Sequence, residues 1–208
     1  GKPAFHNLGH NLSYAELDRL SRDFAAFLRG LPGMGKGERV AIMAPNLLQY
    51  PVALFGILRA GMVVVNVNPL YTPRELEHQL KDSGAKAIVI LENFAHVLQQ
   101  VLGSTPVRHV ITTQVGDMLP RPKRWIVNLV LKKVKKMVPA WRIDGAVRFR
   151  AALARGAATA IRPVEVTRED IAFLQYTGGT TGVSKGGMLT HRNILANMEQ
   201  TGAWISTV

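Results

Sequence analysis

Short apolar runs alternate with longer segments of helical periodicity along most of this chain, and this alternation limits the folds it can adopt. Five runs have the length and composition of strands: Arg39–Met43, 63–65, Ala87–Leu91, 109–112 and 171–176. The run at 63–65 is too apolar to face water on either side, as in an interior strand of a parallel sheet. Because helical segments separate the runs, they predict repeated strand-helix-strand units. We therefore expect an α/β fold with a largely parallel sheet flanked by helices.

Two of the intervening helices carry start signals in their sequence. Ser13 and Glu16 have the spacing of a capping box, in which the hydroxyl and the carboxylate bind amides at a helix start. Thr72 provides a cap before Pro73 at the first helical position, with the acid Glu75 two residues later. Helices are expected over residues 14–30, 47–60, 73–83, 93–102 and 146–155.

Composition excludes several classes of protein. With 208 residues, 47% of them hydrophobic, the chain can bury a substantial core. It has no cysteine, which excludes a disulfide framework, a thiolate metal site and a cysteine nucleophile, and suits a reducing cytosol. No secretory signal follows Gly1, and we expect the natural start to be missing. The most apolar windows, 51–58 and 61–67, are shorter than the about 20 residues that a membrane-spanning helix needs.

The net charge of +12 requires an anionic partner or surface, and most of that charge lies in one segment. A segment at about 117–142 interrupts the alternation, and eight basic residues lie in it without an acid between them: Arg121, Lys123, Arg124, Lys132, Lys133, Lys135, Lys136 and Arg142. Residues 125–138 predict a basic amphipathic helix. Its apolar arc comprises Ile126, Val127, Val130, Leu131, Val134, Met137 and Val138, opposite Asn128, Lys132, Lys135 and Lys136.

Two interpretations of this basic helix are open. Its apolar arc would lie in an anionic membrane surface, with Lys132, Lys133, Lys135 and Lys136 near the headgroups. Alternatively, the arc packs on the protein and the lysines only solvate the other face. Nucleic acid is not expected as a partner, because no nucleic-acid-binding motif accompanies the charge.

The strand at 171–176 runs directly into a loop rich in glycine and hydroxyl side chains. The loop comprises Tyr176, Thr177, Gly178, Gly179, Thr180, Thr181, Gly182, Val183, Ser184, Lys185, Gly186 and Gly187. Glycines let backbone amides point into one concavity that suits anionic oxygens, and the hydroxyls and Lys185 add donors and charge. The alternative is an ordinary flexible loop. The P-loop of NTPases does not match, because Val183 follows Gly182 and Gly186 follows Lys185.

Residues 176–186, followed by Met188 and the run Thr190-His191-Arg192-Asn193, resemble the signature loop of the acyl-adenylating superfamily. The pair Gly178-Gly179 and the run ending at Asn193 are similar to the bacterial long-chain fatty acyl-CoA synthetases. Residues 39–46, 48–53, 59–61 and 67–72 resemble the same enzymes, so the likeness covers essentially the whole chain. Gly187 departs from the larger residue usual there, which would loosen the returning strand. The role of His191 stays open.

This resemblance implies a reaction in two halves. A fatty acid carboxylate attacks the α-phosphorus of ATP to give an acyl-adenylate and pyrophosphate, and the thiol of coenzyme A then displaces AMP. The departing pyrophosphate needs positioned donors and Mg²⁺. Five loop residues are expected to hold the β- and γ-phosphates: Thr177, Thr180, Thr181, Ser184 and Lys185.

The resemblance also implies what the chain lacks. The family places its adenine-binding and magnesium-binding motifs later in the large domain, and its adenylation lysine in a C-terminal domain. We therefore expect residues 1–208 to be an incomplete N-terminal adenylation domain without a catalytic residue or metal ligand, inactive alone. The alternative is a stand-alone ATP-binding or membrane-surface regulatory module. We expect a cytoplasmic location with peripheral contact to the inner membrane, and a homodimer stays open.

Overall fold

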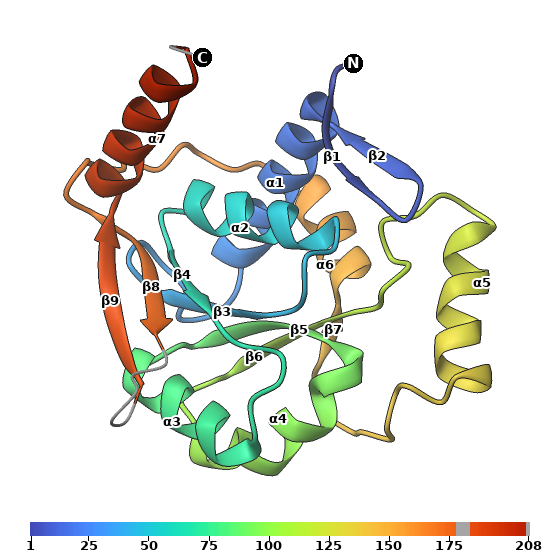
Figure 1. Cartoon of the computed structure of the whole chain (residues 1–208). Coiled ribbons are helices and arrows are strands. Elements are labelled where there is room, and N and C mark those ends of the chain that lie inside the picture. Colours follow the sequence, from blue (N-terminus) through green and yellow to red (C-terminus); the bar gives the residue numbers. More distant parts are fainter. Residues whose placement is uncertain (178–183, 207–208) are drawn as a thin grey trace.

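The computed structural model describes residues 1–177 and 184–206, and its main feature is a seven-stranded sheet between two layers of helices (Figure 1). The strand order is β7-β6-β5-β3-β4-β8-β9, and every neighbouring pair is parallel except β8 and β9. The strands are β3 (Arg39–Met43), β4 (Val63–Asn66), β5 (Ala87–Leu91), β6 (His109–Thr113), β7 (Val147–Arg148), β8 (Ile171–Thr177) and β9 (Lys185–Thr190). The predicted α/β fold with a largely parallel sheet is confirmed.

The central strands are buried on both faces, as their apolar sequences predict. Along β3, Val40 and Ile42 point into one core and Ala41 and Met43 into the other. All of β5 is buried in the same alternating way. Burial on both faces explains why these runs are continuously apolar instead of alternating with polar residues.

Helices α1 (Tyr14–Arg29), α2 (Gln49–Arg59) and α6 (Phe149–Ala157) contribute to one core, and α3 (Pro73–Ser83) and α4 (Ala95–Val101) to the other (Figure 1). Phe24 of α1 is fully buried, and its ring centroid lies 5.0 Å from that of Phe149. Helices α1 and α6 approach very closely at Gly156, where an added Cβ would lie 1.7 Å from the carbonyl oxygen of Asp23. Only glycine permits that approach.

Both predicted capping boxes form. The Ser13 hydroxyl accepts from the amide of Glu16, and the Glu16 carboxylate accepts from the amide of Ser13 at 3.0 Å. Thr72 and Glu75 make the same pair of bonds at the start of α3. Helix α3 ends at Gly84, whose φ of 63° is the left-handed conformation that glycine adopts most easily.

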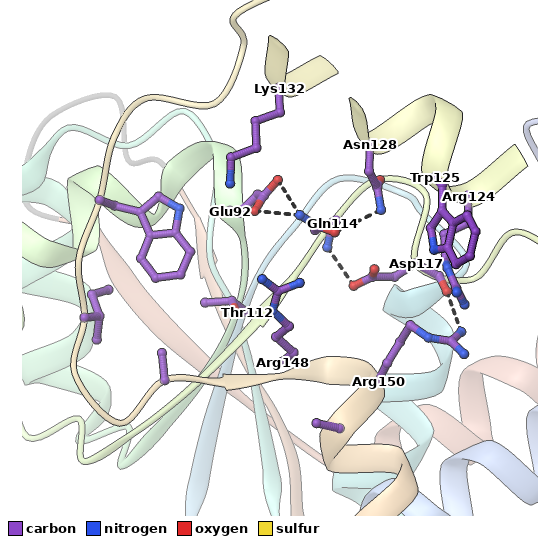
Figure 2. A pocket seen from close by; sticks show the side chains of 14 residues that line it. Glu92, Thr112, Gln114, Asp117, Arg124, Trp125, Asn128, Lys132, Arg148 and Arg150 are labelled. Carbon is purple, nitrogen blue, oxygen red and sulfur yellow. Dashed lines mark hydrogen bonds between the residues drawn. The ribbon is translucent and has the colours of Figure 1, made fainter. Parts of the chain in front are cut away.

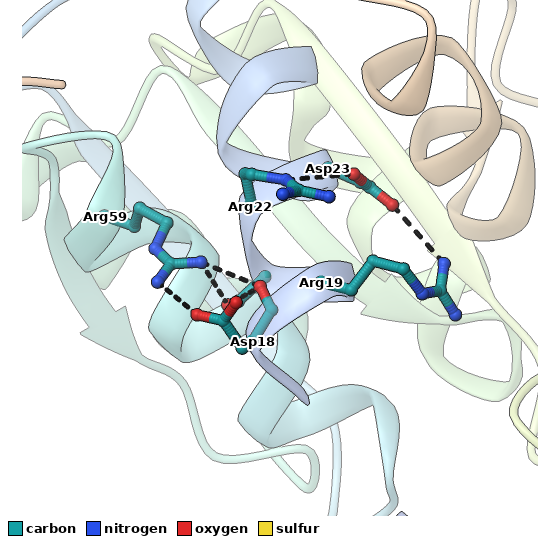
Figure 3. A network of polar contacts seen from close by, with 6 residues as sticks. Asp18, Arg19, Arg22, Asp23 and Arg59 are labelled. Carbon is teal, nitrogen blue, oxygen red and sulfur yellow. Dashed lines mark hydrogen bonds and ion pairs between the residues drawn. The ribbon is translucent and has the colours of Figure 1, made fainter. Parts of the chain in front are cut away.

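Charged side chains pair along α1 and between α1 and the end of α2 (Figure 3). The Arg59 guanidinium donates to the Asp18 carboxylate at 2.5 Å and to the Asp18 carbonyl at 2.7 Å. Asp23, which is buried, lies 3.5 Å from the Arg19 guanidinium and 3.8 Å from that of Arg22. These two arginines therefore compensate the charge of Asp23, since burying a carboxylate without a partner costs free energy.

Several elements differ from the sequence prediction. A separate hairpin of β1 (Pro3–Asn7) and β2 (His10–Ser13) precedes α1, and β7 adds a short edge strand inside the predicted helix 146–155. The predicted helix 93–102 is divided into η1 (Glu92–Phe94), α4 and η2 (Leu102–Ser104). Helix α7 (His191–Ile205), which begins at His191, is capped by Thr190.

The basic helix is shorter than predicted. It forms α5 (Lys123–Leu129) and continues as one turn of π-helix, η3 (Val130–Val134), so residues 135–138 are not helical. The wider π turn changes the angular position of every residue after Leu129. A helical wheel drawn for a regular α-helix does not predict these positions.

Candidate functional site

The predicted phosphate loop lies between β8 and β9, at the carboxyl end of β8. Thr177 pairs with Lys185 in the last rung of this antiparallel ladder, so Tyr176, Thr177, Lys185, Gly186 and Gly187 are held by strand pairing, and Ser184 lies just before β9. The centre of the predicted loop, Gly178, Gly179, Thr180, Thr181, Gly182 and Val183, lies outside the described residues. Carboxyl ends of parallel strands are where open α/β sheets bind ligands.

Tyr176 anchors the base of the loop to α3. Its side chain is buried, and its hydroxyl donates to the Asp82 carboxylate at 2.5 Å. Burial and the adjacent Asp82 carboxylate both raise the pKa of Tyr176, so the phenol stays protonated and remains a donor. On the other strand, a Cβ added to Gly186 would meet the Tyr176 ring at 2.9 Å. A glycine at 186 thus lets the ring pass under β9.

The polar groups beside this anchor divide into two sets. The Ser184 hydroxyl donates to the Thr177 carbonyl at 2.9 Å, and a His78 ring nitrogen lies 3.4 Å from the Ser184 carbonyl oxygen. In contrast, the side chains of Thr177 and Lys185 are exposed and have no hydrogen-bond or ion-pair partner within the described ranges 1–177 and 184–206. An exposed hydroxyl and an exposed ammonium group at the loop base suit an anion.

A cavity of about 310 Å³ opens beside the loop base, at the carboxyl ends of β3, β4 and β8. A chain of hydrogen bonds crosses it: the Tyr50 hydroxyl donates to Asn66 at 2.8 Å, and the Asn66 amide donates to Gln175 at 3.0 Å. The Gln79 side-chain amide donates to the Asn66 backbone carbonyl at 2.7 Å. This polar chain fixes the floor of the cavity next to Tyr176.

Sequence reasoning missed Asn66, Gln175 and Asp82 as parts of this site. A signal for the first existed, because Asn66 is the first polar residue after the apolar run 63–65. Asp82 could not be found from the sequence, since its contact with Tyr176 joins residues 94 positions apart. The structure leaves room for a larger residue at Gly187. Within 4 Å, a Cβ there would meet only the Gln175 carbonyl oxygen of the described residues, at 3.6 Å, an ordinary contact distance.

No group of three or more histidine, aspartate or glutamate side chains is arranged to hold a metal ion in the described part of the chain. No helix among these residues is both long and apolar enough to cross a membrane.

The basic helix α5 places polar side chains against the rest of the protein. The Asn128 side chain accepts from the amide of Gly116 at 2.8 Å and donates to Gln114 at 2.9 Å. Arg124, one turn earlier, is only 8% exposed, and Lys132, one turn later, points to the same side (Figure 2). Of the apolar arc, Val127, Val130, Leu131 and Val138 are half-buried and Ile126, Val134 and Met137 are exposed, so the arc packs on the protein only in part.

The opposite side of α5 and η3, with the residues that follow them, is apolar and open to solvent. We call it the outward apolar stripe, and its members are 55–69% exposed: Trp125, Ile126, Leu129, Val134 and Met137. Lys133, Lys135 and Lys136 are exposed next to it. Asn128 and Lys132, which a regular helix places opposite the apolar arc, face the protein because that face carries the hydrogen-bonding groups of 114–117. Large exposed apolar surface of this kind usually marks an interaction site.

Comparison with known proteins gives consistent matches over this chain. A sequence model of the family described as "AMP-binding enzyme" matches residues 1–207. A long-chain-fatty-acid–CoA ligase from Salmonella typhimurium is 59% identical over 97% of the chain, and its counterpart from Haemophilus influenzae is 56% identical over 99%. The chain spans 36% of the length of each of these relatives.

A solved structure matches as well. The crystal structure of a long-chain-fatty-acid-CoA ligase from Archaeoglobus fulgidus superposes with a TM-score of 0.71 at 28% sequence identity. The likeness covers 97% of this chain and 34% of the solved one. The architecture described above is therefore shared over nearly its full length.

Proposed function

Because the chain belongs to the AMP-binding enzyme family, we propose that it serves the ATP-dependent activation of long-chain fatty acids to acyl-CoA. The observation that carries the proposal is the loop base between β8 and β9, where the exposed side chains of Thr177 and Lys185 lie at the carboxyl edge of the sheet without a partner among residues 1–177 and 184–206. The names of the relatives, which are long-chain-fatty-acid–CoA ligases, support the choice of substrate. The full reaction would join the fatty acid, ATP and coenzyme A through an acyl-adenylate.

The proposed task of this chain is to hold the leaving end of ATP. Lys185 and the hydroxyls of Thr177, Thr180, Thr181 and Ser184 would bind the β- and γ-phosphates, whose negative charge grows as pyrophosphate departs. Donors fixed in advance stabilise that charge without reorganising during the reaction. Bound Mg²⁺ would neutralise part of the same charge.

The anchor beneath the loop gives these donors a fixed position. Tyr176 hydrogen-bonds Asp82 of α3, while Gly186 lies against the Tyr176 ring from the other strand. Both ends of the loop are thus tied to one buried side chain. We propose that Asp82 and Tyr176 act as positioning residues and do not touch the substrate.

We further propose that the chain alone does not complete the reaction. The remainder of the large domain and a C-terminal domain would add the adenine-binding, magnesium-binding and lysine groups. The 208-residue chain is then expected to form no acyl-CoA from palmitate, ATP and coenzyme A. Turnover by the purified chain would contradict this expectation.

Substitution in the loop tests the proposal at the level of the complete enzyme. Replacing Thr180, Thr181 and Lys185 together by alanine should lower the rate of acyl-adenylate formation at least about 100-fold, the typical effect of losing a positioned charge-stabilising donor. Pyrophosphate exchange measures this half-reaction directly. The matched control replaces three hydroxyl or lysine residues away from the loop, Thr105, Thr159 and Lys86, by alanine. Full turnover in the loop variant refutes a phosphate-binding role.

A second proposal concerns location: we propose that the protein is cytoplasmic and contacts the anionic inner face of the membrane through α5. The exposed Trp125, Ile126 and Leu129 support it, because an apolar stripe beside lysines is the usual design of a helix lying in a lipid interface. Each lysine near an anionic surface contributes about 1 kcal/mol of binding free energy. A long-chain fatty acid dissolved in lipid would be within reach of such a protein.

Charge reversal separates lipid contact from general basicity. Changing Lys133, Lys135 and Lys136 to glutamate should weaken binding to phosphatidylglycerol vesicles by about 100-fold or more. The matched control changes the exposed Arg108, Arg155 and Arg168 to glutamate, which alters net charge equally but leaves α5 intact. Equal losses in the two variants would show that the effect depends only on net charge.

The outward apolar stripe would also suit a second copy of the chain. A dimer in sedimentation that dissociates in the variant Leu129→Ser would favour a homodimer instead of membrane contact.

A further inference from the structure

A second cavity, of about 560 Å³, lies far along the sheet from the phosphate loop, at the carboxyl ends of β5, β6 and β7 and beneath α5 (Figure 2). Its size falls within the range of small-molecule sites. Four cationic side chains line it, Arg124, Lys132, Arg148 and Arg150, against two carboxylates, Glu92 and Asp117. The cavity therefore has an excess of two positive charges.

The two carboxylates already have neutral donors. The Gln114 side-chain amide donates to both oxygens of Glu92 at 3.0 Å. Asp117 accepts from the Thr113 hydroxyl at 3.0 Å and from the backbone N–H of Gln114 at 2.8 Å. Burial raises the pKa of Asp117, so its surroundings work against its negative charge. Neither acid forms a salt bridge with a cation of the cavity among the described residues, although the charges of Arg150 and Arg148 offset part of the effect of burial on the pKa of Asp117.

The cations have few partners of their own. Arg150 donates to the Asp117 carbonyl at 2.9 Å. In the described ranges, the side chains of Arg124, Lys132 and Arg148 make no hydrogen bond or salt bridge, although Arg124 stacks on the Trp125 ring at 5.7 Å and is more than nine-tenths buried. The nearby Arg124 charge also lowers the pKa of Arg150, after burial itself. Cations that repel one another in a half-enclosed space favour an anion between them.

The remaining lining indicates what else the ligand carries. Trp141, Ile143, Ala146 and Ala151 form an apolar wall beside the cations, and Trp125, a 59% exposed member of the outward apolar stripe, also borders the cavity at the α5 side. Inorganic phosphate would leave most of this volume empty. Arginine side chains bind phosphate oxygens in pairs through their planar fork of donors. We propose that this cavity is a binding site for a phosphomonoester that bears an apolar or aromatic group.

A soluble ligand and a lipid headgroup share this chemistry, and two probes distinguish them. Phenyl phosphate represents the soluble source, and vesicles containing phosphatidic acid, whose headgroup is a phosphomonoester, represent the lipid source. Calorimetric titration of the 208-residue chain with phenyl phosphate is expected to give a Kd of about 1 mM or tighter. The indole N–H signals of Trp125 and Trp141 should shift in NMR spectra during the titration. Phenol, which lacks the phosphate, should cause neither effect.

Single substitutions locate the bound probe. Arg148→Gln and Lys132→Gln should each weaken binding about tenfold, because each removes one charge-assisted contact. Lys135→Gln, just after the same helical segment and outside the cavity, is the matched control and should change Kd less than about twofold. Lys185→Gln should also have no effect, which separates this cavity from the phosphate loop. Thermal unfolding of each variant verifies that it is folded.

The outcomes decide the proposal. Arg148-dependent binding of phenyl phosphate assigns a soluble ligand, and Arg148-dependent binding of phosphatidic acid vesicles alone assigns a lipid headgroup. Absence of both, or binding that Lys185→Gln abolishes and Arg148→Gln does not, overturns the site. None of these measurements requires acyl-CoA synthesis, so they stand or fall independently of the proposed function.

Discussion

Helices α1 and α5 have the same kind of sequence pattern and opposite orientations. Helix α1 turns its apolar face inward, where Phe24 and Leu28 are fully buried, and leaves its charged face in water. Helix α5 turns Arg124 and Asn128 inward and leaves Trp125, Ile126 and Leu129 exposed. An amphipathic pattern therefore identifies an apolar face but not what covers it.

The difference has a local physical cause. Opposite α1 lies a hydrophobic core, so burial of apolar surface determines its orientation. Opposite α5 lie the polar groups of 114–117, including the buried amide of Gly116, which needs a hydrogen-bond acceptor. Asn128 provides that acceptor, and the apolar side of α5 must then face outward.

The largest expected effect is on the α1 side of this comparison. Phe24→Ala removes a fully buried ring that contacts Phe149, and should lower the free energy of unfolding by about 3 to 5 kcal/mol. Urea denaturation followed by circular dichroism measures it. Phe55→Ala on α2, where the ring is 43% exposed, is the control and should cost much less. Equal losses would mean that α1 is not the core helix described.

The next effect tests the inward side of α5. Asn128→Ala removes the hydrogen bonds to Gly116 and Gln114 and leaves a buried amide without an acceptor, which should cost about 1 to 3 kcal/mol. Leu129→Ala, the adjacent residue on the outward apolar stripe, is the control and should be nearly neutral. If Leu129→Ala proves more costly than Asn128→Ala in chemical denaturation, the orientation of α5 is wrong.

A smaller effect concerns the start of α1. Ser13→Ala should cost about 1 kcal/mol by removing the cap, whereas Ser13→Thr should retain it. Hydrogen bonds from the Ser13 amide and hydroxyl lower the pKa of Glu16 from its usual 4.5. The stabilisation by ionised Glu16 is therefore present above pH 4.5 and is lost as the pH falls through the lowered value. Unfolding curves across this range should show a weaker acid dependence for Ser13→Ala, and an unchanged dependence would contradict the box.

The smallest effect is predicted for the outward apolar stripe. Ile126→Ser should change the free energy of unfolding by less than about 0.5 kcal/mol, because the side chain is 56% exposed and no core surrounds it. The same substitution in the core, Ile57→Ser, is the matched control and should be strongly destabilising. A marked loss of stability with Ile126→Ser would show that another part of the protein covers the stripe.

Much of the fold follows from the sequence, for identifiable reasons. The strands at 39–43 and 87–91 match the prediction because burial on both faces requires continuous apolar runs. The capping boxes at Ser13 and Thr72 match because they depend on neighbours only three residues apart. Local chemistry thus determined these elements.

Features set by distant partners could not be predicted in this way. Strand β7 has only two residues, and its position is set by pairing with β6. The orientation of α5 depends on Gly116, and the loop anchor on Asp82, neither of which has a local signal. The assignment of phosphate contacts to Thr177, Thr180, Thr181, Ser184 and Lys185 stays a prediction, since residues 178–183 lie outside the described part.

Trp125 gives the most direct test of the outward apolar stripe as a membrane contact. With Trp141→Phe and Trp204→Phe, the only remaining indole is that of Trp125. Vesicles of brominated phosphatidylglycerol should quench its fluorescence and shift the emission to the blue, because the exposed ring would enter the lipid interface. If these vesicles bind the protein and the Trp125 emission is neither quenched nor shifted, the stripe does not contact the membrane.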